Sequence, residues 1–87
     1  MVELLRRELF ELLVSVCRQR GVMLEELCGR GRARSVALAR HELWWRIRVL
    51  PNRHYSYPEI GRMFGRDSTT ILQGVAAHER FLGRERS

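Results

Sequence analysis

Apolar side chains recur every three or four residues through most of this chain, which is the spacing of one face of an α-helix. No segment combines strand-like alternation with a hairpin turn. The pattern therefore predicts an all-α fold of about five helices in a single small domain spanning residues 1–87. The helices are expected at residues 2–19, 22–28, Ser35 to about Leu50, 57–64 and 68 to about 82.

The fourth expected helix carries signals at both ends. Ser56 is a candidate N-cap, and Glu59 stands three residues later, where it completes a capping box. Pro58 suits the first turn of a helix, and Gly65 suits its end. Inside this helix the side chains expected to face the core are those of Ile60, Met63 and Phe64.

A three-residue turn joins the fourth and fifth helices, in the order "YPEIGRMF", "GRD", "STTILQGVAAHERF". Two helices joined by a short turn containing glycine are typical of a helix-turn-helix, here at about residues 57–80. In that motif the second helix lies in the DNA major groove and its first residues contact base edges. Asp67 is expected to cap this helix, with Ser68, Thr69 and Thr70 in its first turn and Gln73 one turn later.

The charge of the chain favours a polyanionic partner. All 16 basic residues other than histidine are arginines, and the formal net charge is +6. The segment "GRGRARS" forms a basic loop between the second and third helices, with Arg30, Arg32 and Arg34. Basic arms that enter the minor groove beside a helix-turn-helix are a known pairing. Double-stranded DNA is therefore the expected partner.

The stretches "RARSVALAR" and "YPEIGRMFGRDSTTIL" together resemble the C-terminal DNA-binding domain of the bacterial replication initiator DnaA. The resemblance covers roughly residues 20–80, and residues 2–19 are similar to the leading helix of that family. It implies a Trp-repressor-like helical fold that binds duplex DNA at short asymmetric boxes. The residues that fit the family signature are Glu59, Ile60, Gly61, Phe64, Arg66, Asp67, Thr69, Thr70 and Ile71.

The resemblance also implies roles for basic residues near the third helix. Arg32 would enter the minor groove. Arg34, Arg40 and His41 would hold phosphates near the start of that helix.

In the major groove, the resemblance implies base contacts from Asp67, Ser68 and Thr69, with Thr70 and Arg66 near the DNA backbone. Three features depart from the family pattern. Ser68 stands where the family usually has histidine, the turn is one residue shorter than in many members, and the segment "VLPNRHYSY" is slightly longer than usual. These departures bear on which box is preferred more than on DNA binding itself.

The expected function is sequence-preferring binding of double-stranded DNA, as a stand-alone regulator of transcription or replication at short DnaA-box-like sites. The chain has no room for an ATPase module, so no nucleotide is expected. The alternative is a protein-interaction module that kept the fold and lost the specific DNA contacts. Trp44 and Trp45 point ~100° apart on a helix, so one is expected in the core. The other, partly exposed, would anchor a homodimer or a protein partner.

Metal binding is not expected. His41, His54 and His78 match no zinc-ligand spacing together with Cys17 and Cys28. His54 is expected in solvent and His78 on a helix surface. The two cysteines are expected to be small buried hydrophobic residues in a reducing compartment. No metal and no cofactor are predicted.

Catalysis and membrane insertion are also not expected. Asp67 beside Ser68 lacks the features of a nucleophile elbow, so an enzyme is not predicted. No apolar run approaches the ~18 residues of a membrane span. The N-terminal stretch "MVELLRRELF" carries Glu and Arg inside its apolar run, so it is not expected to be a signal peptide. The expected location is the cytoplasm, in association with the nucleoid.

Overall fold

Helices make up most of the chain in the computed structural model, which describes residues 2–31, 33–51 and 53–86, and the side chains of 7–31, 33–51 and 53–84. Within these residues there is no strand, so the expected all-α fold is confirmed. The helices are α1 (Val2–Arg20), α2 (Leu24–Cys28), α3 (Arg34–Arg48), α4 (Tyr57–Phe64) and α5 (Ser68–Arg86).

The observed helix ends follow the strength of the local signals. α4 has the predicted bounds, because Ser56 accepts from the Glu59 backbone and Gly65 ends the helix at a φ of 65°. α3 begins one residue earlier than expected, and its N-cap, Ala33, offers no side-chain acceptor. α2 begins two residues late, and α5 continues to Arg86 rather than ending near residue 82.

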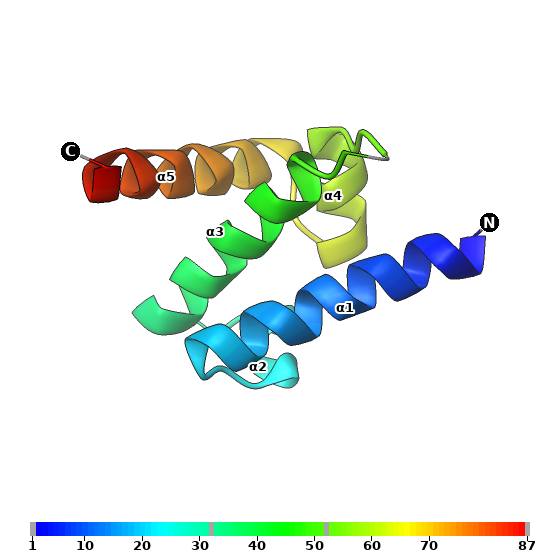
Figure 1. Cartoon of the computed structure of the whole chain (residues 1–87), viewed down its shortest axis with the longest axis horizontal. Helices are drawn as coiled ribbons and strands as arrows, with labels where there is room; N and C mark the ends of the chain where they lie inside the picture. The colour runs from blue at the N-terminus through cyan, green and yellow to red at the C-terminus, as the bar shows by residue number, and fades with distance from the viewer. Residues whose placement is uncertain (1, 32, 52, 87) are drawn as a thin grey trace.

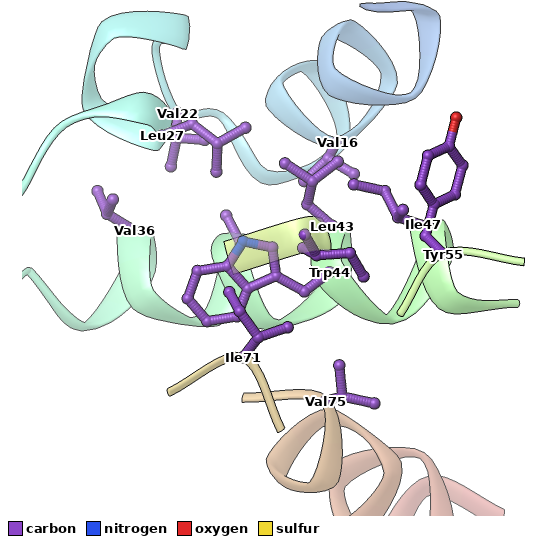
Figure 2. Close-up of a cluster of buried hydrophobic side chains, with 12 residues drawn as sticks. Val16, Val22, Leu27, Val36, Leu43, Trp44, Ile47, Tyr55, Ile71 and Val75 are labelled. Carbon is purple, nitrogen blue, oxygen red and sulfur yellow. The ribbon is translucent and has the colours of Figure 1, made fainter. Parts of the chain in front are cut away.

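α3 lies between α1 and α5 and packs against both (Figure 1). Figure 2 shows the core along this helix, with Leu43 and Trp44 between Val16 of α1 and Val75 of α5. The buried hydrophobic side chains are Val16, Val22, Leu27, Val36, Ala39, Leu43, Trp44, Ile47, Tyr55, Ile60, Ile71 and Val75.

A buried carboxylate fastens α1 to α3. Glu42 is 8% exposed and forms ion pairs with Arg20 and Arg46, each at 2.8 Å between nitrogen and oxygen. Two cations around one carboxylate satisfy the charge that burial would otherwise penalise.

The tandem tryptophans divide as predicted, since Trp44 is 3% exposed and Trp45 is half-buried. Two other burial predictions are wrong. Met63 is 42% exposed, because only the Ile60–Gly61 side of the short helix α4 is buried. Cys28 is exposed at the end of α2, where Leu27 occupies the buried side, and both cysteines are free thiols. Cys17 is half-buried, and burial raises the pKa of its thiol.

Candidate nucleic-acid interface

The turn between α4 and α5 is compact because of two glycines, Gly65 in the turn itself and Gly61 in α4 beneath it. Gly65 adopts the left-handed conformation that ends α4. The Arg66 backbone N–H donates to the Gly61 carbonyl at 2.9 Å, which folds the turn back on α4. A Cβ atom at Gly61 would overlap the Arg66 carbonyl oxygen, so no larger residue fits without movement of the turn. The turn thereby fixes the direction in which α5 begins.

The first turn of α5 presents a capped, exposed cluster of short polar side chains. Asp67 Oδ1 accepts from the Thr70 backbone N–H at 2.8 Å, which confirms Asp67 as the N-cap. Hydrogen bonds from Thr70 hold the pKa of the Asp67 carboxyl below its usual value. Ser68, Thr69, Thr70 and Gln73 are all exposed. Five of the residues predicted to contact DNA, Asp67 included, therefore share one end of one helix.

The buried side of the same helix is held close to α3 by Gly74. A Cβ atom at Gly74 would lie 2.5 Å from Trp44 Cε3 and 2.9 Å from His41 Cδ2. The two helices thus approach at a distance that only glycine allows. An interior helix glycine is the sequence signal for such an approach, and Gly74 is not among the residues predicted from the sequence. The contact fixes how closely α5 packs against α3.

Arg40 differs most from its expected role as a phosphate ligand. It is 7% exposed, and its guanidinium donates to four backbone carbonyls. The acceptors are Leu27 at 3.0 Å, Gly31 at 2.7 Å, Glu26 at 2.7 Å and Gly29 at 2.6 Å. Burial lowers the pKa of Arg40, and the charge of Arg66 lowers it further. Because its donors are engaged inside the protein, Arg40 is not among the residues proposed to contact DNA.

Arg66 lies at the surface of the turn but also has internal partners. Its guanidinium donates to the Phe64 carbonyl at 2.9 Å and to the Gly29 carbonyl at 2.8 Å. The side chain is half-buried, in contrast to the exposed cluster that follows it. Arg66 therefore connects the helix-turn-helix to the segment that follows α2.

The remaining residues predicted to contact DNA are Arg34, His41 and Arg32, and the first two differ in their exposure. Arg34 is exposed in the first turn of α3, as a phosphate ligand would be. His41 is half-buried against Trp44, with ring centroids 5.9 Å apart, and its Nδ1 has no hydrogen-bond partner among the described residues. Burial lowers the pKa of His41, with smaller contributions from His78 and Arg40. Arg32, the predicted minor-groove residue, lies outside the described residues.

A second feature lies toward the other end of α5. A hollow of about 420 Å³ opens between α1, α3 and α5, and Trp45, Phe81 and Leu82 contribute to its lining. The prediction that His78 lies on a helix surface is wrong. It is 6% exposed, because Trp45 and Phe81 both pack their rings against it. His54 is exposed, as expected.

Two broader properties of the described residues bear on the site. No three of their histidine, cysteine and acidic side chains gather as a metal site would require. None of the helices described is long and apolar enough to cross a membrane.

Comparison with known proteins gives one family. Residues 11–77 match the family described as "Bacterial dnaA protein helix-turn-helix". This match contains α2, α3 and α4, the turn after α4 and the exposed first turn of α5. No solved structure gave a significant match.

Individual relatives point the same way. The chromosomal replication initiator protein DnaA of Deinococcus radiodurans is 32% identical over 78 residues, which cover 90% of this chain and 16% of that protein. The DnaA protein of Thermus thermophilus is 39% identical over 66 residues, covering 75% of this chain and 15% of the relative. The DnaA protein of Deinococcus deserti is 31% identical over 78 residues, which cover 90% of this chain and 17% of that protein. The chain thus spans about one sixth of the length of these relatives.

Proposed function

This chain belongs to the family of the bacterial DnaA helix-turn-helix, a DNA-binding rather than a catalytic domain, and from that premise we propose that it binds double-stranded DNA with sequence preference. The observation that carries the proposal is the start of α5. There the N-cap Asp67 and the first-turn residues Ser68, Thr69 and Thr70 are exposed side by side, directly after the compact loop that Gly61 and Gly65 allow.

The first turn of α5 is suited to the major groove. That groove is ~12 Å wide and admits a helix, and short side chains let the helix backbone approach the base edges. The Thr69 methyl group can pack on a thymine methyl group, and the hydroxyl groups can serve base edges or phosphates. Gln73, one turn later and exposed, can reach a base edge or a phosphate.

Affinity comes mainly from arginine. Arg30 is exposed in the basic loop and Arg34 is exposed where α3 begins, and Arg32 lies between them in sequence. Each phosphate that such a cation neutralises releases counterions, so binding should weaken steeply with salt. In the finer form of the proposal, the protein acts as a regulator of transcription or replication at short DnaA-box-like sites on the nucleoid.

Fluorescence anisotropy tests this proposal. The probes are a duplex that carries a DnaA-type box and a scrambled duplex of the same composition, each at two salt concentrations. We expect the box to bind about tenfold tighter or more at equal salt. Equal, weak binding to both duplexes that vanishes at higher salt would contradict sequence preference.

A matched pair of arginine variants separates phosphate contacts from net charge. Arg34→Ala should weaken binding to both duplexes alike and lower the slope of log affinity against log salt by about 0.9. Arg80→Ala removes the same charge from an exposed position further along α5. It should leave the slope near the wild-type value. Equal effects of the two variants would mean that Arg34 contributes only through the net charge.

A protein-interaction module is the second candidate, and the hollow at Trp45 is the observation in its favour. Trp44 is buried in the core and cannot serve as an anchor, so the expected homodimer or protein partner would have to use Trp45. Sedimentation of the wild type and of Trp45→Ala tests for self-association. A dimer that depends on Trp45, with no DNA binding, would favour this candidate.

A further inference from the structure

Two guanidinium groups from different parts of the chain meet at one backbone carbonyl. The Gly29 carbonyl accepts from Arg40 of α3 at 2.6 Å and from Arg66 of the helix-turn-helix at 2.8 Å. Neither arginine is close to Gly29 in sequence, and Arg66 is separated from it by 37 positions. The Gly29 carbonyl therefore brings together three segments that are distant in sequence: the end of α2, α3 and the turn before α5.

Arg40 holds the end of α2 and the segment after it. The last carbonyls of a helix have no partner within the helix, and a cation is favourable there. Arg40 provides both the hydrogen-bond donors and the positive charge. It donates to the Glu26, Leu27 and Gly31 carbonyls as well as to that of Gly29. The backbone is fixed on both sides of Arg30, in the loop that carries the proposed phosphate contacts.

Arg66 then fixes this segment to the DNA-reading turn. Its two terminal nitrogens bridge the Phe64 carbonyl, at the end of α4, and the Gly29 carbonyl. The Arg66 backbone N–H is itself bonded to Gly61, so the side chain projects from a turn with little freedom. The planar fork of arginine suits two acceptors held at a fixed spacing, whereas the ammonium of lysine does not.

We propose that Arg40 and Arg66 are positioning residues that hold the Gly29–Gly31 segment against the helix-turn-helix, so that Arg30 and the first turn of α5 meet DNA as one preset surface. The proposal rests on the proposed function, because it assigns how the two DNA-contacting parts are aligned. A loop aligned before binding does not have to be ordered on the DNA, which favours affinity and fixes the register between the two grooves. It differs from the resemblance-based roles, in which both residues face the DNA backbone.

Side-chain NMR on the free protein tests the Arg40 part. The Arg40 Nε–H donates to the Leu27 carbonyl at 3.0 Å. We expect it to give a slowly exchanging signal at neutral pH that does not move when a box duplex is added. The Arg34 Nε–H should become protected only with DNA. An Arg40 signal that is unprotected in the free protein and becomes protected on DNA would overturn the proposal.

Arg66→Lys tests the link to the turn, with Arg80→Lys as the matched control. Lysine keeps the charge but lacks the planar fork with which Arg66 reaches the two carbonyls. In the free protein, Arg66→Lys should speed exchange at the Arg40 Nε–H and at the Gly29 amide, which donates to the Glu26 carbonyl. On the box duplex it should weaken binding about tenfold, as expected for lost preorganisation. Arg80→Lys should change none of these quantities.

The outcomes separate this inference from the proposed function. Unchanged exchange at both sites in Arg66→Lys, with wild-type affinity, would overturn the positioning role while leaving DNA binding intact. Failure of the wild type to bind any duplex would overturn the proposed function, and the exchange measurements would still decide whether the ties exist. Circular dichroism establishes that each variant is folded. If Arg66→Lys does not fold, the Arg40 signal of the wild type with and without DNA decides the proposal.

Discussion

Thr69 combines a hydroxyl group and a methyl group at the exposed start of α5, where both can meet base edges. Thr69→Ala should cost ~1–3 kcal/mol of binding free energy on the box duplex and little on the scrambled duplex. Thr70→Ala, at the next position, should weaken binding to both duplexes alike, because the family resemblance implies that Thr70 lies near the DNA backbone. Anisotropy on the two duplexes measures both. Equal losses from Thr69→Ala on both duplexes would show that Thr69 does not contribute to base preference.

His41 links burial to pH dependence. Its pKa is lowered in the folded protein by burial and by the charges of His78 and Arg40. The unfolded chain therefore binds the proton more readily, so the free energy of unfolding should fall as the pH drops below about 6.5. At higher pH, where His41 is neutral in both the folded and the unfolded chain, the free energy of unfolding should not depend on His41. Urea unfolding at pH 8, 7, 6 and 5.5 measures the slope.

The variant His41→Gln should flatten that slope. His54→Gln removes an exposed histidine from the segment between α3 and α4 and is the matched control. A slope in His41→Gln equal to that of the wild type would contradict the assignment.

Arg40 shows what the family resemblance alone could not predict. The family resemblance implied that Arg40, with Arg34 and His41, would hold phosphates. Its position on α3 pointed elsewhere, because it stands four residues after Val36 and three before Leu43, both of which are buried. An arginine on the buried face of a helix needs internal acceptors. Those acceptors are backbone carbonyls of a loop, and a sequence does not indicate where such carbonyls lie.

At the scale of elements, the join between α3 and α5 depends on Gly74. Gly74→Ala places a methyl group 2.5 Å from Trp44 Cε3, and such overpacking typically destabilises by ~1–3 kcal/mol. Gly83→Ala lies in the same helix with nothing within 4 Å of the added carbon. It should stabilise by ~0.5–1 kcal/mol through helix propensity. Urea unfolding of both variants checks this, and a stable Gly74→Ala protein would contradict the close approach.

Element boundaries were predictable where the sequence marks them with side-chain chemistry. α4 has a capping box at one end and a left-handed glycine at the other, and both of its bounds were predicted. α5 begins at the predicted residue because Asp67 caps it. The prediction that α5 ends near residue 82 is wrong. The helix continues to Arg86, because it contains no proline or left-handed glycine that would end it earlier. α3 begins after Ala33, which has no capping side chain.

At the scale of the whole molecule, α5 presents two different surfaces at its two ends. Thr69 lies in the turn proposed to enter DNA, and Phe81 lines the hollow beside Trp45. Twelve residues of helix separate them by about 18 Å along the axis. A protein bound at the hollow would leave the first turn of α5 clear. The two candidate functions therefore predict binding at different places on the same helix.

An NMR titration of the isotopically labelled protein with an unlabelled box duplex tests the central claim most directly, because it shows which residues meet DNA. The account predicts that backbone signals of residues 67–73 and 29–34 shift on binding, while the Trp45 indole signal stays in place. Shifts confined to Trp45, Phe81 and Leu82, or binding that leaves residues 67–73 unmoved, would contradict it.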